Sequence, residues 1–487
     1  MKAIKSPPTR LLAIAALLAA LPAAAAPDIT DLGTLRNDNS GNSGAYAISS
    51  DGSLVVGQAS NNSLVDRATV WSGSNWGTKT DLGTLRASNS GNAAAYAFSR
   101  DGSVVVGFAT DDNSDHRATV WSGSNWTTKT DLGTFKTGNS GISAAHAVSS
   151  DGTVVVGQAI DDNYELRAAV WSGSGWGTKT DLGTPRSDNF GHSQANAVSR
   201  DGSVVAGDAQ SDYGGTIRAT IWSGSGWTTK TDLGTLRSDN SGVSYATAAS
   251  GDGSVVGGNA ENNNGERHAT IWSGSNWTTK TDLGTLRSDN SGESEVRAVS
   301  DDASVVVGNA EHDNDPYLKH ATVWSGSGWT TKTALGTLKN DNSGHAAAQA
   351  VSSDGSLVFG DAENDNGDSH ATVWSGSGWT TKTDLGTLKS DNSGESIALA
   401  ASGDGSVVGG YADNDNGRNR ATIWSGSNWA TKTDLGTLKT DNSGSSQVNA
   451  ISADGKFAVG WAINDNNEGR AAVWNLRNLN NARPADT

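Results

Sequence analysis

The chain has 487 residues, with 61 Gly and 18 Trp but only 7 Pro, 1 Met and no Cys. Hydrophobic residues make up 35% and charged residues 18%, which is too little Leu, Glu and Lys for a helical protein, and the Trp content excludes a disordered one. The formal net charge of −17 disfavours nucleic acids and anionic membrane surfaces as partners, and the lack of Cys excludes disulfides and Cys-ligated zinc.

The first 25 residues are organised like a secretory signal peptide. A basic start precedes the apolar run of residues 11–26, and Ala23-x-Ala25 provides a small-residue cleavage site. An uncleaved anchor is the alternative, but the run is shorter than the ~20 residues that span a bilayer. We therefore expect cleavage after Ala25 and no membrane insertion of the mature chain. The protein would then be secreted, periplasmic or on the surface of a bacterial cell.

One sequence string recurs along the rest of the chain. DLGT begins at Asp31 and returns at intervals of 50 to 52 residues as far as Asp434, with ALGT at Ala334 in one unit. Nine such units occupy residues 26–475, and residues 476–487 form a C-terminal tail. Internal repeats of this length are typical of propellers and solenoids.

Each unit contains signals for four short strands in a fixed order. A run of the type AxAVS leads to an Asp-Gly turn, as at Asp151-Gly152, and then to a β-branched run such as residues 154–156. An acidic loop then leads to RATVW or HATVW, and WSGSxW turns the chain into TKTDLGTL. Four strands in roughly 40–50 residues are the signature of a propeller blade, whereas solenoid coils are usually shorter and separate sandwiches would not repeat at this interval. We predict an all-β fold, a β-propeller of nine four-stranded blades.

The two ends of the repeat region indicate how the ring closes. Residues 28–35 have the sequence of a fourth strand without the first three, and the last unit stops after its third strand, near Trp474. Because an unpaired strand edge is a liability, we expect the N-terminal strand to complete the last blade. Nine blades exceed the common range of about four to eight.

These motifs resemble the HAF family of extracellular repeat proteins, whose pattern is DLGTL, A-x-A-I/V-S-x-D-G, VVVG and H-A-F/T-x-W. Residues 320–324 and 370–374 carry the last motif as HATVW, most other units have Arg in place of His, and the resemblance extends from Asp28 to Trp474. The order of strands in a unit is also similar to that of WD-repeat propellers. The resemblance implies export and a binding role, and it implies no known reaction.

Two repeated side-chain positions allow a structural and a functional interpretation. Trp pairs such as Trp71 and Trp76 recur five residues apart in eight units; they could stack on sugars, but we favour packing on one another across a hairpin. A basic residue recurs once in all nine units, and we expect it to pair with the Asp of DLGT or of the Asp-Gly turn rather than to form a ring that captures anions. The basic positions are Arg67, Arg117, Arg167, Arg218, His268, His320, His370, Arg420 and Arg470.

The acidic loops between the second and third strands are the least repetitive part of the chain, and both length insertions fall in them. We expect them to emerge on the same face as the DNSG connections between blades. Because binding usually resides on loops of a rigid scaffold, we place the binding face there; solvated turns without a binding role are the alternative. The candidate residues are Asp111, Asp112, Asp212, Tyr213, Glu311, Asp313, Asp315, Tyr317, Asp413 and Asp415.

One acidic loop has a weak similarity to a calcium site. Asp361, Glu363 and Asp365 place oxygen ligands at alternate positions, as calcium loops do. However, Asn366 replaces the Gly that such a loop requires, and Thr372 replaces its bidentate Glu. We therefore favour solvated turn residues over a Ca²⁺ site and expect no cofactor.

The inner strands carry one variable position and little catalytic potential. The position is held by Tyr46, Tyr96, His146, Asn196, Thr247, Arg297, Gln349, Leu399 and Asn449. Only one acid on these strands, Glu295, lies within two residues of it, which disfavours the paired carboxylates of glycoside hydrolysis. The sequence also contains no G-x-S-x-G, H-E-x-x-H or P-loop motif.

Together these features favour a secreted or cell-surface, non-enzymatic binding or adhesion scaffold. Its near-identical blades suit multivalent binding, and its partner would be a glycan, a cation or a protein, with the chain itself a monomer. A hydrolase or lyase acting on a polysaccharide is the alternative, and a purely structural surface protein is a third possibility.

Overall fold

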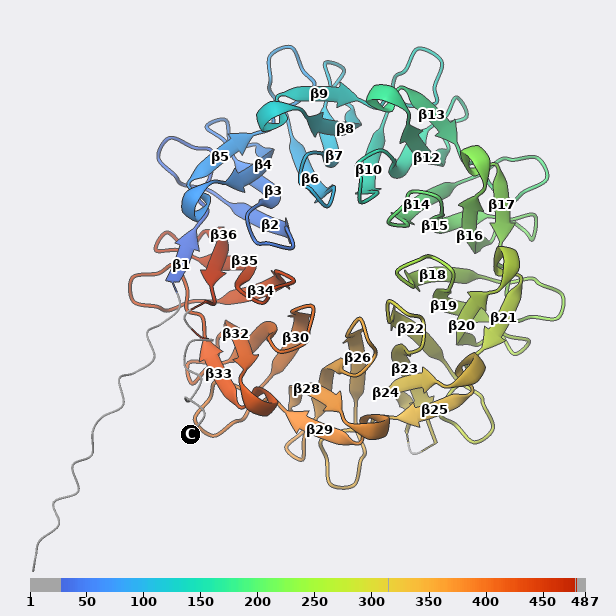
Figure 1. Ribbon diagram of the computed structural model, residues 1–487, viewed down its shortest axis with the longest axis vertical. Coiled ribbons are helices and arrows are strands. Elements are labelled where there is room, and N and C mark those ends of the chain that lie inside the picture. The colour runs from blue at the N-terminus through green and yellow to red at the C-terminus, as the bar shows by residue number, and fades with distance from the viewer. Residues whose placement is uncertain (1–27, 314, 478, 480–487) are drawn as a thin grey trace, which may run out of the picture.

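The computed structural model describes residues 28–313, 315–477 and 479. Nine four-stranded antiparallel sheets surround a central axis as the blades of a β-propeller (Figure 1). The predicted fold class and number of blades are thereby confirmed. The predicted signal peptide and nearly all of the tail beyond residue 477 lie outside the described residues.

Each blade has its first strand near the centre of the ring and its fourth strand at the rim (Figure 1). The first strands are β2 (Ser43–Ile48), β6 (Ala93–Phe98), β10 (Ser143–Val148), β14 (Ser193–Val198), β18 (Ser244–Ala249), β22 (Ser294–Val299), β26 (Ala346–Val351), β30 (Ser396–Ala401) and β34 (Ser446–Ile451). The second strands are β3 (Val55–Ser60), β7 (Val105–Thr110), β11 (Val155–Ile160), β15 (Val205–Gln210), β19 (Val256–Glu261), β23 (Val306–His312), β27 (Val358–Glu363), β31 (Val408–Asp413) and β35 (Phe457–Ile463).

The outer half of each blade contains the third and fourth strands and, in blades 1 to 8, a short 3₁₀ turn between them. The third strands are β4 (Asp66–Ser72), β8 (His116–Ser122), β12 (Leu166–Ser172), β16 (Ile217–Ser223), β20 (Arg267–Ser273), β24 (Asp315–Ser325), β28 (Ser369–Ser375), β32 (Asn419–Ser425) and β36 (Gly469–Asn475). The fourth strands are β5 (Thr78–Asp81), β9 (Thr128–Asp131), β13 (Thr178–Asp181), β17 (Thr229–Asp232), β21 (Thr279–Asp282), β25 (Thr331–Ala334), β29 (Thr381–Asp384), β33 (Thr431–Asp434) and, in blade 9, β1 (Asp28–Asp31). The 3₁₀ turns are η1 (Ser74–Trp76), η2 (Ser124–Trp126), η3 (Ser174–Trp176), η4 (Ser225–Trp227), η5 (Ser275–Trp277), η6 (Ser327–Trp329), η7 (Ser377–Trp379) and η8 (Ser427–Trp429).

The N-terminal strand closes the ring, as the sequence predicts. β1 pairs antiparallel with β36, with Asp28 opposite Asn475 and Asp31 opposite Ala472, and the sheet order of blade 9 is β1-β36-β35-β34. In Figure 1 the blue β1 lies against the red β36. The two ends of the repeat region therefore share one blade, which stabilises the ring against opening at that point.

The hydrophobic core lies between the blades, in nine clusters of buried residues. The cluster between blades 9 and 1 contains Leu32 and Trp71, and the indole N–H of Trp71 donates to the carbonyl of Leu32 (2.8 Å). The second Trp of the motif, Trp76, donates instead to the carbonyl of Gly52 in the turn of its own blade (3.0 Å). Both positions are structural, but the expected ring-on-ring packing is wrong, because no aromatic pair joins two Trp residues among the described residues.

A bulge in every first strand explains the variable position at the centre of the ring. In blade 1 the register between β2 and β3 shifts between Ala45 and Ala47, so that Tyr46 has no partner on β3 and is 42% exposed. The chains approach closely at this bulge, and a Cβ on Gly57 would lie 2.0 Å from the carbonyl oxygen of Gly44. The Gly of VVVG is therefore required by the bulge, and the bulge redirects the variable side chain.

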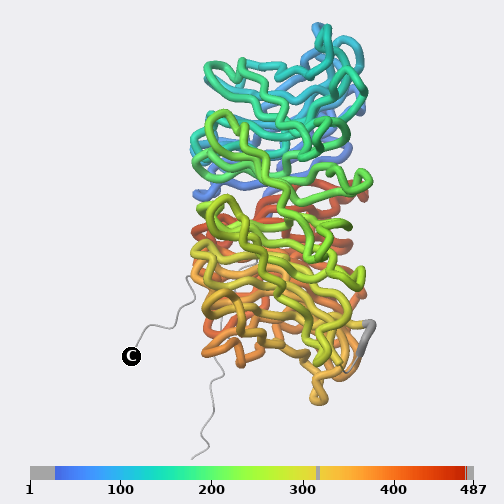
Figure 2. Tube along the Cα trace, turned by 90° about the vertical axis from the view of Figure 1, so that its right-hand side faces the viewer, coloured from blue at the N-terminus to red at the C-terminus, as the bar shows by residue number. Residues whose placement is uncertain are grey.

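The ring has two faces of different composition, and Figure 2 shows it from the side. We call the face with the Asp-Gly turns and WSGSxW hairpins the turn face, since the bond from Trp76 to Gly52 joins these two elements. The loop face carries the loops between second and third strands and the DNSG connections, which bond to one another, as Asn37 does to Asn62 (2.9 Å). The predicted sharing of one face by these two elements is thereby confirmed. In the described part of the chain, no helix is long and apolar enough to cross a membrane.

Candidate functional site

The basic side chain of each repeat is buried, and in eight of the nine blades it lies within 4.0 Å of the partly exposed Asp of DLGT. It lies on the third strand beside the Asp of DLGT on the fourth strand, as Arg117 does beside Asp131 (3.1 Å), and its side chain is at most 2% exposed. The pairs are Arg67–Asp81, Arg117–Asp131, Arg167–Asp181, Arg218–Asp232, His268–Asp282, His370–Asp384, Arg420–Asp434 and Arg470–Asp31. In blade 6, where Ala334 replaces the Asp, the ring of His320 stacks on that of His312 at 5.0 Å. The expected pairing with DLGT is confirmed, and burial closes this set of cations to an external anion.

The Asp of the Asp-Gly turn stabilises the turn itself and does not pair with the basic residue. In blade 1, Ser49 Oγ donates to Asp51 Oδ1 (2.7 Å), and the backbone N–H of Ser53 donates to the same oxygen (3.0 Å). These bonds, with that of Ser49 the strongest, lower the pKa of Asp51. The Ser–Asp bond recurs in all nine blades.

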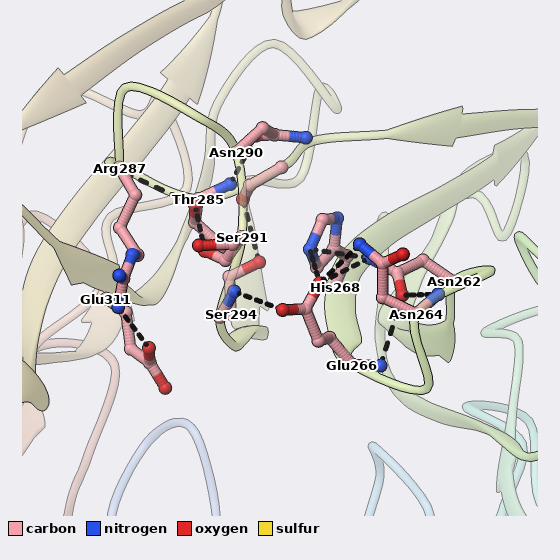
Figure 3. Close-up of polar contacts among 12 residues, drawn as sticks. Asn262, Asn264, Glu266, His268, Thr285, Arg287, Asn290, Ser291, Ser294 and Glu311 are labelled. Atoms are coloured by element: carbon pink, nitrogen blue, oxygen red, sulfur yellow. Dashed lines mark hydrogen bonds and ion pairs between the residues drawn. The ribbon is translucent and has the colours of Figure 1, made fainter.

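On the loop face, polar contacts join one blade to the next. We call the region of these contacts a junction; it comprises the loop of one blade and the connection and second strand of the following blade. Figure 3 shows the junction between blades 5 and 6. Glu266, in the loop of blade 5, accepts hydrogen bonds from Asn262 Nδ2 (3.0 Å) and from the backbone N–H of Gly292 in the connection (2.8 Å). In the same junction, Arg287 Nη1 lies 3.5 Å from Glu311 Oε2. Two carboxylates, those of Glu266 and Glu311, therefore make polar contacts with the connection at this junction.

Four of the predicted binding residues are acceptors in the scaffold of the loop face. Each lies at a loop tip and accepts a hydrogen bond from the backbone N–H of the residue 25 positions earlier, in the connection that enters the same blade. They are Asp112, Asp212, Asp313 and Asp415, and Asp365 of the predicted calcium loop makes the same bond. The acidity of these loop tips thus has a structural cause that the sequence interpretation missed.

Three other candidates also have partners within the chain. Asp111 accepts hydrogen bonds from two backbone N–H groups of its own loop (both 2.9 Å), and Asp413 accepts one from the connection that enters its blade (3.1 Å). Glu311 pairs with Arg287, as described above. Of the candidates with described side chains, Tyr213 is the one large apolar group that is exposed, at 43%.

The longer insertion adds strand as well as loop. β23 and β24 extend to His312 and Asp315, which pair with each other, so blade 6 has a longer hairpin than its neighbours. Asp315 and Tyr317 lie on this extension, and their side chains fall outside the described part of the chain.

The three residues of the predicted calcium loop do not converge. Asp361 accepts a hydrogen bond from Ser369 Oγ (2.8 Å), whereas Glu363 Oε1 lies 2.7 Å from Lys339 Nζ, and Asp365 is at the loop tip. Among the described residues, no group of three His, Asp or Glu side chains is placed to hold a metal ion.

Two further carboxylates, Glu295 on a first strand and Asp208 at the junction between blades 3 and 4, are isolated rather than paired. Glu295 Oε1 lies 2.8 Å from Arg297, which neutralises it. Asp208, on β15, lines a cavity of about 220 Å³ and accepts a hydrogen bond from Asn196 (3.1 Å), and burial raises its pKa to about 6.

A larger cavity, of about 610 Å³, opens at the junction between blades 8 and 9. Its wall includes Arg418 from the loop of blade 8, Lys439 from the connection, and Trp461 and Ile463 from β35. Asn414, Asn416, Ser443, Gly444, Ser445 and Asn467 complete the lining. The site combines one indole and one aliphatic side chain with two cations and several amide and hydroxyl groups, and this largely polar lining suits a polar ligand.

The sequence interpretation missed this cavity, although one signal for it was present. Of the 18 Trp residues, nine occupy the first repeated position and eight occupy the second. The remaining one is Trp461. The corresponding residue in blade 6 is Asn309, and in blade 4 it is Asp208. A Trp outside the repeat pattern was therefore a visible departure from the structural rule.

Comparison with known proteins finds only distant similarities. No protein-family model matches the chain, and no curated protein matches it in sequence. Similar solved structures include TolB from Acinetobacter baumannii (11% identity, TM-score 0.30, 58% of this chain and 63% of that one) and the β-propeller domain of the Trilobed protease from Pyrococcus furiosus (9%, 0.37, 70% and 95%). A third is an oligogalacturonate lyase from Vibrio parahaemolyticus (8%, 0.35, 78% and 88%). The chain therefore spans less than two thirds of the first of these proteins, and similarities of this size carry no argument about activity.

Proposed function

We propose that the chain is an exported, monomeric, non-enzymatic binding scaffold of the HAF-repeat type that holds its ligand on the loop face. The observation that carries the proposal is the division of labour among polar residues. Polar residues that recur at one position pair on the outer strands and hold the Asp-Gly turns, whereas the loops between second and third strands vary in length and charge between blades. Variable groups on a rigid scaffold are where binding usually resides.

The geometry of the loop face supports this role. Each of the nine loops is bonded through an Asp or Asn at its tip to the connection that enters its blade. Loops that are already ordered lose little conformational entropy when a ligand binds. A glycan is the partner that the neutral and charged hydrogen-bonding groups of this face suit best, and an exported chain would meet one outside the cytoplasm.

A binding screen with two matched variants tests the proposal. The mature chain is applied to a glycan array together with a chimera in which loop 209–217 is replaced by a copy of loop 159–166, and with the turn-face variant R100A/R200A. We expect the wild-type chain to bind, the chimera to bind more weakly or with altered preference, and the turn-face variant to bind as wild type. Binding that is lost only in R100A/R200A would contradict the proposal.

A specific observation favours a second candidate, a polysaccharide-acting hydrolase or lyase. Asp208 has its pKa raised to about 6 by burial, which is a value suited to a general acid. If this carboxyl protonates a substrate, D208N abolishes turnover of a polysaccharide panel while the glycan array pattern stays unchanged. Absence of turnover by the wild-type chain would leave the binding scaffold as the function.

A further inference from the structure

The residues that line the cavity between blades 8 and 9 can be compared with those at the equivalent positions of another junction. The junction between blades 5 and 6 has Glu266, Arg287, Asn309 and Glu311 where this junction has Arg418, Lys439, Trp461 and Ile463, each 152 residues later. Three of these four changes remove a carboxylate or introduce a large aromatic side chain. The contacts made at the equivalent positions of other junctions show what each of these changes removes.

Arg418 stands where blades 2, 3, 5, 7 and 9 have an acid, which in three of these blades accepts a backbone N–H of the following connection. At the corresponding position, Glu266 accepts the backbone N–H of Gly292 (2.8 Å), and Asp115 accepts that of Gly141 (2.8 Å). A guanidinium cannot accept a hydrogen bond, so Arg418 cannot bind the N–H of Gly444 in this way. Among the described residues, no carboxylate lies within ion-pair distance of its guanidinium.

Lys439 has lost its counter-ion at the same junction. The corresponding Lys339 lies 2.7 Å from Glu363, whereas Ile463 replaces that Glu here. In blade 3, where Ile160 also replaces the acid, Lys136 lies 3.7 Å from the ring centroid of Tyr164 instead. Among the described residues, Lys439 has neither kind of contact, although it lines the cavity.

The acids closest to the cavity along the chain have partners of their own. Asp413 and Asp415 accept backbone N–H groups of the connection that enters blade 8. Asp441 accepts the backbone N–H of Ser443 (2.8 Å) and also feels the charge of Lys439. Two cations thus face one cavity without a bonded counter-ion, in a chain whose formal net charge is −17.

We propose that this cavity binds an acidic sugar unit. Trp461 is partly buried and lines the cavity, so its apolar face suits a pyranose ring. Arg418 and Lys439 supply charge-assisted hydrogen bonds to a carboxylate, and Asn414, Ser445 and Asn467 suit the hydroxyls. The volume of about 610 Å³ lies within the ~300–1,000 Å³ that is usual for ligand sites. The inference rests on the proposed function and assigns to it one site and one ligand class.

The test uses uronate oligosaccharides of glucuronate, galacturonate and mannuronate, each with its carboxyl-reduced form, titrated against the mature chain by calorimetry. We expect at least one uronate to bind ten-fold or more tightly than its reduced form. R418E, which restores the acid of the repeat, and W461N, which restores the residue of blade 6, should each weaken binding at least ten-fold. R267E changes the net charge as R418E does, lies on the loop face in another junction, and should bind as wild type.

Three outcomes would overturn the inference. One is equal affinity for a uronate and its reduced form, and another is binding that R418E and W461N leave unchanged. The third is inorganic sulfate that competes as tightly as the sugar, since the site would then recognise any anion. The inference and the proposed function fail separately: a glycan that the loop 209–217 chimera loses while R418E retains it keeps the loop-face scaffold and removes this cavity as its site.

Discussion

The junction between blades 5 and 6 and the junction between blades 8 and 9 occupy the same place in the repeat and have opposite chemistry. In the first, Glu266 accepts the backbone N–H of Gly292 and Glu311 pairs with Arg287. In the second, Arg418 and Ile463 stand at those positions, and the junction holds a cavity of about 610 Å³. One place in the repeat can therefore hold a structural contact in one junction and a cavity in another, while the ring stays closed.

The largest loss of stability is expected when β1 is removed. This strand completes blade 9, and blade 9 forms one side of the cavity. Deletion of residues 26–35 removes β1, the Arg470–Asp31 ion pair and the burial of Leu32, which is 2% exposed. We expect a loss of about 3–5 kcal/mol from apolar burial and the unpaired cation. Hydrogen exchange of residues 446–475 should accelerate before that of blades 3 to 6. Equal protection of all blades after the deletion would contradict closure by β1.

A second prediction compares ion pairs of Arg with those of His. D131A leaves Arg117, whose side chain is fully buried, without its carboxylate. We expect a loss of about 3 kcal/mol, because a guanidinium stays charged. D282A, opposite His268, should cost roughly half as much, since an imidazole can lose its proton. Urea denaturation of the two variants checks the order, and equal losses would show that the charge of the partner is not what matters.

The stability of the ring should also depend on Asp208. Its pKa in the folded state is raised to about 6 by burial, above the ~3.9 of an unfolded chain, so the folded state binds the proton more tightly. The contribution of Asp208 to stability is then greatest below about pH 4 and falls by about 2–3 kcal/mol as the pH rises to about 7. D208N should remove this dependence and be the more stable protein at pH 7.

The acids of the turns provide a separate pH window. Hydrogen bonds, with that from Ser352 the strongest, lower the pKa of Asp354 to about 2, so its contribution is lost only as the pH falls below about 4. Thermal unfolding of wild type and D208N between pH 4 and 7 therefore isolates Asp208. Parallel curves for the two proteins across this range would contradict the assignment.

The smallest change in stability is expected when Arg418 and Glu266 are each replaced by the residue at the equivalent position of the other junction. R418E supplies an acceptor for the N–H of Gly444, and we expect a gain of about 1 kcal/mol. E266R removes the acceptor of Gly292 and should cost a similar amount or slightly more. Thermal unfolding of both variants measures the two changes in stability. A destabilised R418E would show that Arg418 has a structural role of its own.

The fold could be predicted from the sequence because every local signal recurs. DLGT, the Asp-Gly turn and the VVVG run fix the strand order nine times, and the lone strand at residues 28–35 fixes the closure. Local patterns that agree with one another in this way specify a single fold. Even so, the roles of single residues were less visible: the two indoles of WSGSxW have separate carbonyl partners.

The site could not be predicted in the same way, because its contacts join loops to connections that lie about 25 residues away in the sequence. Asp112 and Asp212 were chosen for their charge and their variable loops, yet each accepts a backbone N–H from a connection 25 residues earlier. The recurrence of Asp or Asn at this position in all nine loops is a signal for a structural role. Trp461 and Arg418 left a signal of the opposite kind, as departures from the repeat, and the comparison of equivalent positions is what exposes them.

The central claim is that the ligand site lies where the repeat is broken. Hydrogen exchange of the mature chain, with and without the best-binding glycan of the array, tests this claim most directly. The account predicts the strongest protection at residues 414–418, 439–445 and 461–467, with any weaker protection limited to loops of the same face such as 209–217. Protection on the turn face, or protection spread evenly over all nine loops, would contradict it.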